Sequence, residues 1–176
     1  MPTAFTVDRS RQLSTGLRLE LTDLKLGPMD AEIEAHVASE YPGGLSQHGF
    51  NYLLRADREA GFADSQQIEH YFELARRVFR PDAPSRFQSM FASESVDDAL
   101  LFRTESQSDL DTPIWEVHYG TPAIKVDMRG LNQSGVAPYA TTFRAERYWQ
   151  GLPNGLTPCR WELIIPLPVS VGLRIQ

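Results

Sequence analysis

Alternation of hydrophobic and polar side chains predicts short strands toward both ends of the chain. The pattern follows a Ser-Thr-Gly turn near the start, returns in the middle as two segments joined by a Gly-Thr-Pro turn, and closes the sequence. Alternation with a period of two is typical of strands that bury one face. The predicted strands are residues 17–22, 114–119, 123–128, 160–165 and 169–175. Pro166 and Pro168 separate the last two strands or mark a sheet edge.

Apolar positions at helical spacing predict helices between these strands. The clearest set is Ile68, Tyr71, Phe72, Ala75, Val78 and Phe79, with Pro81 just beyond its end. This spacing gives a helix one continuous buried stripe. Weaker patterns predict helices over residues 30–41, where Asp30 is the cap, and over 142–150. The order of elements predicts a single α+β domain over residues 1–176.

One segment combines a strand pattern, polar side chains and a helix start. Residues 85–92 alternate as a strand and include Arg86, with small hydroxyl groups at Ser85 and Ser89. Ser95 and Asp98 then resemble a capping box, which begins a helix. A strand that runs directly into a helix places such polar groups at the mouth of a cleft. The alternative is an ordinary strand-to-helix corner.

Composition narrows the function classes. The chain has 176 residues, 41% hydrophobic residues and a formal net charge of −6, so nothing in the total charge favours binding to phosphate backbones. Cys159 is the only cysteine, and the four histidines share no metal-ligand spacing, so we expect no disulfide framework and no metal. No apolar run reaches membrane-spanning length and the start lacks a signal-peptide pattern, so we expect a cytoplasmic protein without membrane contact.

Glu162 and Arg9 are the main candidates for chemistry. Glu162 stands at the head of an apolar strand between Trp161 and Leu163, so its carboxylate either reaches solvent or lines a cleft. In a cleft, a carboxylate can hold a ribose hydroxyl and stabilise a neighbouring oxocarbenium-like centre. Arg9 either clamps a phosphate through a bidentate contact or pairs with a surface acid such as Asp8.

The order of these motifs resembles the ADP-ribosyltransferase-like fold, including its small bacterial branches and NAD-cleaving toxins. An opening strand with a basic residue and a Gly turn covers residues 5–16, and the hydroxyl-bearing strand-helix unit covers 85–102. A strand at 114–117, a Glu-bearing strand at 161–165 and a Val-rich strand at 168–171 follow. The resemblance covers most of the chain, through short and degenerate motifs. It implies a split antiparallel β-sheet core with flanking helices around a cleft.

The resemblance also implies roles for particular residues. Arg9 takes the position that holds the adenosine part of NAD, and Ser89, with Ser85 and Arg86 nearby, lines the nicotinamide pocket. Glu162 takes the catalytic position beside the nicotinamide ribose. The resemblance further allows Tyr148 and Trp149 to stack on the nicotinamide or cover the site.

The activity implied is transfer of ADP-ribose from NAD to a protein or nucleic-acid acceptor that the sequence does not identify. The Glu-x-Glu pattern of arginine-specific members is absent, which leaves the acceptor open and keeps Glu146 as an alternative catalytic acid. Two other functions stay open. One is a NAD glycohydrolase, in which water is the acceptor; the other is a non-catalytic acidic binding or inhibitor protein. Both enzyme hypotheses, the transferase and the glycohydrolase, also allow a partner protein that neutralises the activity.

Overall fold

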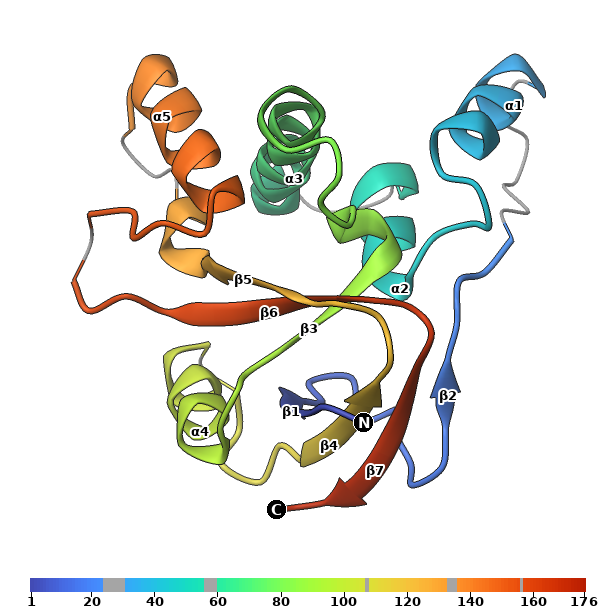
Figure 1. Cartoon of the computed structure of the whole chain (residues 1–176), viewed down its shortest axis with the longest axis vertical. Coiled ribbons are helices and arrows are strands. Elements are labelled where there is room, and N and C mark those ends of the chain that lie inside the picture. Colours follow the sequence, from blue (N-terminus) through green and yellow to red (C-terminus); the bar gives the residue numbers. More distant parts are fainter. Residues whose placement is uncertain (24–30, 56–59, 107, 133–135, 156) are drawn as a thin grey trace.

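The protein is described by a computed structural model, which defines residues 1–23, 31–55, 60–106, 108–132, 136–155 and 157–176. The predicted cap Asp30 lies outside these residues. The elements divide into two antiparallel sheets and the helices that flank them (Figure 1). The predicted α+β class, with two separate antiparallel sheets, is therefore confirmed.

The first sheet has the strand order β1-β4-β7-β2 and the second has the order β3-β6-β5, with every pair antiparallel. The bounds are β1 Thr3–Val7, β2 Arg18–Leu19, β3 Ser89–Ala92, β4 Ile114–Tyr119, β5 Ile124–Asp127, β6 Trp161–Pro166 and β7 Val169–Arg174. Phe5 and Ser93 exchange two backbone hydrogen bonds of 2.9 and 2.7 Å, and so connect β1 with the end of β3. The two sheets meet at this bridge.

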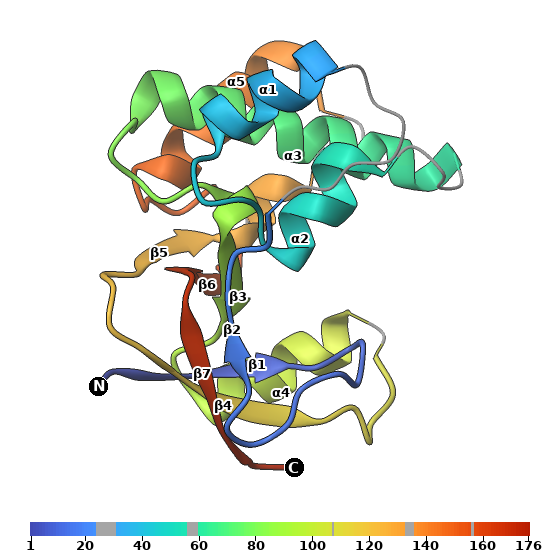
Figure 2. The ribbon, with the colours of Figure 1, turned by 90° about the vertical axis from the view of Figure 1, so that its right-hand side faces the viewer.

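The helices lie mainly on one side of the second sheet. Helices α1, α2, α3 and α5 lie together above it, whereas α4 lies beside the first sheet (Figures 1 and 2). Their bounds are α1 Ala31–Glu40, α2 Gln47–Gly49, α3 Ala60–Phe79, α4 Val96–Glu105 and α5 Pro138–Trp149. A π-helical segment, η1 Phe50–Leu54, continues α2, and two short 3-10 segments are η2 Arg86–Gln88 and η3 Met128–Leu131. In the portion of the chain with defined structure, no helix has the length and apolar character needed to cross a membrane.

Apolar clusters hold these layers together. Except for Val78, which is exposed, the predicted stripe of α3 packs against α5 and the second sheet, in a cluster that includes Phe72, Ala75, Val126, Tyr148, Trp149 and Ile164. A second cluster lies between the two sheets and contains Ala4, Ala92, Val117, Leu163, Ile165 and Val169. Strand β6 contributes side chains to both clusters because its alternate residues point to opposite faces. It is therefore fixed from both sides at the centre of the molecule.

The corner at residues 85–98 differs in part from the prediction. Only Ser89–Ala92 is a strand, because the Ser85 hydroxyl accepts a hydrogen bond from the Phe87 N–H and begins a 3-10 turn instead. The N-cap half of the predicted capping box is present. The Ser95 hydroxyl accepts from the Asp98 N–H at 3.1 Å and donates to the Asp98 carboxylate at 2.6 Å, at the start of α4.

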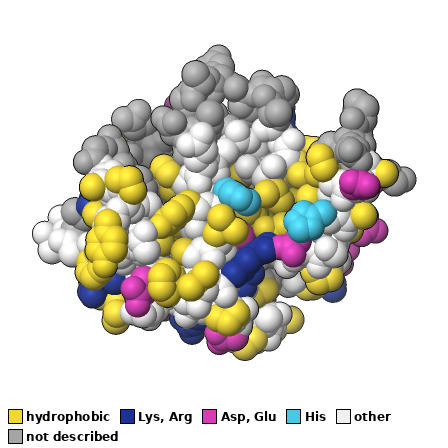
Figure 3. All heavy atoms as spheres, turned by 90° about the horizontal axis from the view of Figure 1, so that it is seen from above, with side chains coloured by type: hydrophobic (Ala, Val, Ile, Leu, Met, Phe, Trp, Pro, Cys, Tyr) yellow, Lys and Arg dark blue, Asp and Glu magenta, His cyan; other side chains and the backbone are white. Residues whose placement is uncertain are grey.

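The outer face of the helical layer carries scattered apolar side chains, with charged and histidine side chains among them (Figure 3). Leu74 and Val78 of α3 and Tyr139 and Phe143 of α5 are exposed. Single exposed apolar side chains are common on protein surfaces. A group of buried charged side chains, which includes Glu69, Glu73 and Arg86, lies elsewhere, where α3 meets the second sheet.

Candidate active site at the junction of the two sheets

A cavity of about 940 Å³ lies where the sheets meet. Its walls come from the end of β1, the α2–η1 segment, α3, β3 and the start of β6. Four of the residues predicted from the sequence line it together: Arg9, Arg86, Ser89 and Glu162. The cavity is within the size range of ligand sites in proteins, and it is large enough for a dinucleotide.

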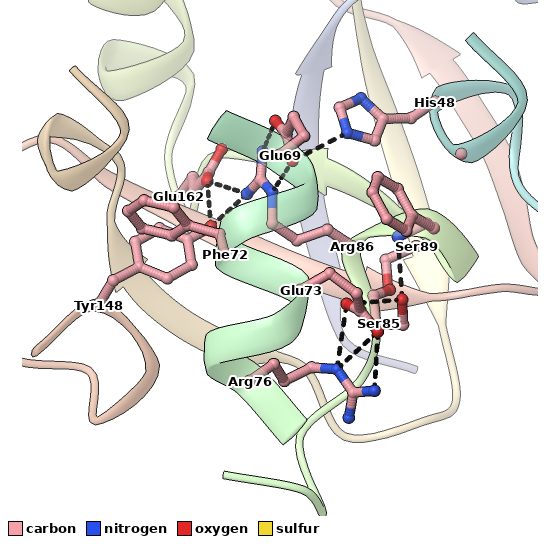
Figure 4. Close-up of polar contacts among 12 residues, drawn as sticks. His48, Glu69, Phe72, Glu73, Arg76, Ser85, Arg86, Ser89, Tyr148 and Glu162 are labelled. Atoms are coloured by element: carbon pink, nitrogen blue, oxygen red, sulfur yellow. Dashed lines mark hydrogen bonds and ion pairs between the residues drawn. The ribbon is translucent and has the colours of Figure 1, made fainter. Parts of the chain in front are cut away.

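Arg86 is the centre of a buried polar cluster in the cavity wall (Figure 4). Its Nε and Nη2 atoms donate to the two carboxylate oxygens of Glu69 at 2.7 and 2.8 Å. Its Nη1 atom donates to Glu162 Oε1 at 2.7 Å and also to the Tyr148 hydroxyl. The guanidinium lies 4.2 Å from the centre of the Phe91 ring. Arg86 is only 3% exposed, so these contacts replace water around its charge.

The protonation states in this cluster follow from its charges. Burial acts to raise the pKa of Glu69, but the charge and hydrogen bonds of Arg86, together with the nearby His48 ring, outweigh it and hold that pKa well below its usual range. Burial acts to lower the pKa of Arg86, but Glu69, Tyr148 and Glu162 together more than offset it and raise that pKa well above its usual value. Burial raises the pKa of Tyr148 well above its usual value, with Arg86 opposing and Glu162 adding to the rise. The ion pair is therefore charged, and Tyr148 keeps its proton to donate.

Glu162 is anchored through one oxygen only. Oε1 accepts the bond from Arg86 and a 2.9 Å bond from the Tyr148 hydroxyl. Within the residues that have defined positions, Oε2 accepts no hydrogen bond. The start of β6 is fixed by the buried Asp127 carboxylate, which accepts a hydrogen bond from the Arg160 N–H at 3.0 Å. The structure thus holds one carboxylate oxygen in place and leaves the other available at the cavity wall.

His48 adds an aromatic group to the same wall. Its Nε2 atom lies 3.3 Å from Glu69 Oε2, an ion-pair distance when the ring is protonated. The ring stacks on Tyr52 with centroids 4.4 Å apart and meets the edge of Phe91 at 4.7 Å. Single π-helical turns such as η1, which carries Tyr52, often occur at functional sites.

A smaller chamber of about 70 Å³ adjoins the main cavity at Glu162. Its lining is mainly apolar and includes Phe91 of β3 and Leu101 and Phe102 of α4. Phe91, Phe102 and Glu162 line both spaces, so the two lie side by side at these residues. Cys159 also lines the smaller chamber and has no disulfide partner in the chain.

Arg9 and the two serines occupy different environments. Arg9 is exposed, and its guanidinium lies 6.0 Å from the centre of the Phe102 ring at the cavity edge. Ser89 is buried and donates to the Ser85 carbonyl at 2.7 Å. Ser85 is not among the residues that line the cavity, and its hydroxyl donates to Glu73 at 3.0 Å. Ser85 therefore shapes the turn that carries Arg86.

The expectation that Tyr148 and Trp149 stack on a ligand needs correction. Both side chains are fully buried, and neither lines a cavity. Trp149 donates from Nε1 to the Phe72 carbonyl at 2.7 Å and belongs to the core between α3 and α5. Tyr148 reaches the site through its hydroxyl instead of its ring. Glu146, the alternative acid, lies on α5 outside both cavities and accepts a bond from Gln150.

Sequence reasoning missed Glu69 and His48. Glu69 does carry a signal, because Glu69, Phe72, Glu73 and Arg76 recur at the spacing of one helix face, and charged residues inside such a stripe indicate buried pairing. His48 carries no comparable signal. Among the residues with defined positions, no group of three or more His, Cys, Asp or Glu side chains is arranged to hold a metal ion.

Residues 54–176 match the model of a protein family described as "Protein of unknown function (DUF2441)". The matched range includes Glu69, Arg86, Tyr148 and Glu162, the four residues of the buried cluster, whereas Arg9 and His48 precede it. A comparison with curated proteins gives no match.

Proposed function

We propose that this chain, which belongs to the DUF2441 family, cleaves the nicotinamide–ribose bond of NAD and transfers ADP-ribose to a macromolecular acceptor. One observation carries the proposal. Arg9, Ser89 and Glu162, which are far apart in the sequence, line one cavity. That arrangement favours an enzyme over a binding protein that presents the same residues on separate surfaces. The two antiparallel sheets around the cavity agree with the resemblance to the ADP-ribosyltransferase-like fold.

The two adjoining spaces suggest how NAD binds. The nicotinamide ring packs against Phe91 and Phe102 at the mouth of the small chamber, which is too small to enclose the whole ring. The nicotinamide ribose lies at Glu162, where both spaces meet. The larger cavity holds the remainder of the molecule, and Arg9 at its edge offers a cation for the diphosphate.

In the chemical step, the bond between ribose C1′ and the nicotinamide nitrogen breaks, and its electron pair moves to that nitrogen. Nicotinamide leaves as a neutral molecule and C1′ becomes an oxocarbenium-like centre. Glu162 stabilises this positive charge through space, with Oε2 free to accept a bond from a ribose hydroxyl. A nucleophile then forms the new bond to C1′ and loses its proton. A protein or nucleic-acid group makes the reaction a transfer, and water makes it a hydrolysis.

The decisive experiment is incubation of the full chain with NAD that carries isotopic labels in both the nicotinamide and the adenosine parts. Release of nicotinamide supports the proposal. Adenosine label on macromolecules of an added cell lysate identifies a transferase, and free ADP-ribose alone identifies a glycohydrolase. If the protein neither binds nor cleaves NAD, the proposal is overturned and an acidic binding protein is favoured. A transferase of this kind acts in the cytoplasm, either of its producer or of a cell that receives it as a toxin or effector.

A further inference from the structure

We infer that Glu69 is a positioning residue that keeps the negative charge of Glu162 available for the reaction, by taking up the charge of Arg86. The inference rests on the proposed function, because it concerns how the same site stabilises the ribose cation. Glu69 lies on α3, and Glu162 lies on β6. The two carboxylates bind one guanidinium in different ways.

The two carboxylates bind different numbers of the guanidinium nitrogens of Arg86. Glu69 takes the Nε and Nη2 edge with both oxygens, the fork arrangement in which arginine binds a carboxylate most strongly. Glu162 takes only Nη1, with one oxygen, and shares this contact with the Tyr148 hydroxyl. The side chains of Arg86 and Glu69 are only 4% and 8% exposed, so solvent screens their pairing little.

The charge balance explains what this division achieves. Two carboxylates face one guanidinium, so with a neutral His48 the group carries one net negative charge. If Glu162 were the only partner of Arg86, the pair would be neutral and would attract a developing cation weakly. Because Glu69 already balances Arg86, the guanidinium orients Glu162 without cancelling its charge. Such preorganised charge is what lowers the barrier to a charged transition state.

A purely structural role for Glu69 and the proposed positioning role predict different results, so kinetic measurements on variants can distinguish them. In Glu69→Gln, the side chain keeps its shape and loses its charge, and the full charge of Arg86 then falls on Glu162. We expect kcat for nicotinamide release to fall roughly ten- to hundredfold, less than the hundred- to thousandfold of losing a direct stabilising group. The KM for NAD stays within about twofold, because the intact substrate does not carry the developing ribose charge.

Glu73→Gln is the matched control. Glu73 is a fully buried carboxylate one turn further along α3, and it pairs with Arg76 and Ser85 instead of Arg86. The substitution lowers stability in the same way as Glu69→Gln, because each removes the charge of a buried ion pair. We expect the folded Glu73→Gln protein to keep the kcat of the wild type. Equal losses of kcat in the two variants would overturn the inference.

Two further variants test charge against shape. Removing both charges in Glu69→Gln/Arg86→Gln leaves Glu162 with its own charge, so kcat should recover at least tenfold relative to Glu69→Gln, whereas a structural role predicts a further loss. Glu69→Asp keeps the charge on a shorter side chain and should retain kcat within tenfold. If Glu69→Gln does not fold, Glu69→Asp and the double variant decide. A loss of kcat greater than tenfold in Glu69→Asp would overturn the inference. A kcat of the double variant more than a thousandfold below that of Glu69→Asp would also overturn it. Absence of nicotinamide release by the wild type would instead overturn the proposed function itself.

Discussion

Tyr148 and Glu162 are joined by a 2.9 Å hydrogen bond from the phenolic hydroxyl to Oε1. The bond connects the last turn of α5 with the start of β6. Tyr148 is fully buried, so rotation of Glu162 away from it would leave a buried hydroxyl without its acceptor. A core aromatic residue thus fixes the orientation of a carboxylate at the cavity wall, and the first prediction concerns that carboxylate.

Replacing Glu162 with Gln should abolish most of the activity and leave NAD binding intact. Glu162 stabilises a charge that develops only as the bond breaks, so its loss affects kcat far more than KM. Removing one such group costs on the order of 2.7 to 4 kcal/mol, or roughly a hundred- to thousandfold in rate. Release of labelled nicotinamide by the purified variant measures the effect.

Glu146→Gln is the control for this experiment, because Glu146 lies on α5 outside both cavities. We expect it to behave as the wild type. Retained release in Glu162→Gln together with loss in Glu146→Gln would transfer the catalytic role to α5. Retained release in both would end the transferase interpretation of these carboxylates.

Arg9→Ala should weaken NAD binding and hardly change stability. A charged contact to a phosphate contributes roughly 1.5 to 3 kcal/mol, which corresponds to about a tenfold or greater rise in Kd. Arg9 is exposed and makes no ion pair among the residues with defined positions, so Tm should stay nearly constant. Calorimetry with NAD provides the measurement, and Arg174→Ala, an exposed arginine away from both cavities, is the control. Equal affinities of Arg9→Ala and the wild type would assign Arg9 to the surface.

Phe102→Ala should raise the KM for NAD. The substitution removes a ring from the wall of the small chamber, and aromatic pairs contribute about 0.5 to 1.5 kcal/mol beyond their buried area. We therefore expect KM to rise roughly two- to thirteenfold by this loss alone. Leu100→Ala, on the same helix and outside the chamber, separates this effect from weakening of α4. A KM that rises equally in both variants would show that the chamber does not hold the nicotinamide.

Trp149→Phe should lower stability without changing the KM for NAD. The substitution removes the indole N–H that donates to the buried Phe72 carbonyl, and the loss of such a hydrogen bond costs about 0.5 to 1.5 kcal/mol. Urea unfolding and steady-state kinetics of the same sample measure both quantities. A large rise in KM with unchanged stability would return Trp149 to the ligand site.

The stability contributed by Glu69 should depend on pH in a defined direction. Its pKa in the folded protein lies far below the ordinary value of 4.5, so folding favours the ionised form. This contribution to stability is fully present above about pH 5. It decreases as the pH falls below the pKa that the Glu69 carboxyl has in the unfolded chain. We expect the difference in unfolding free energy between wild type and Glu69→Gln to be largest near pH 7 and to shrink by pH 3. Urea unfolding at both pH values checks this, and a constant difference would contradict the ion pair.

Local patterns in the sequence determined much of the secondary structure. The stripe from Ile68 to Phe79 became the inner face of α3 except at Val78, which is exposed, and Ser95 caps the start of α4 as predicted. Glu162 was identified because it interrupts an apolar strand, and the structure places it at a cavity wall. These features depend on neighbours within four positions along the chain, where periodicity and capping preferences act.

Tertiary structure decided the remainder, because it depends on contacts between distant segments. Residues 85–88 have the alternation of a strand, but the Phe87 carbonyl accepts a 2.8 Å bond from the Ser46 N–H and is met so closely by Gly49 that a Cβ there would lie 2.2 Å from it. The resulting turn directs Arg86 toward Glu69 and Glu162, which are 17 and 76 positions away. No local period encodes such a pairing, since it arises only when α3 and β6 pack on opposite sides of one guanidinium.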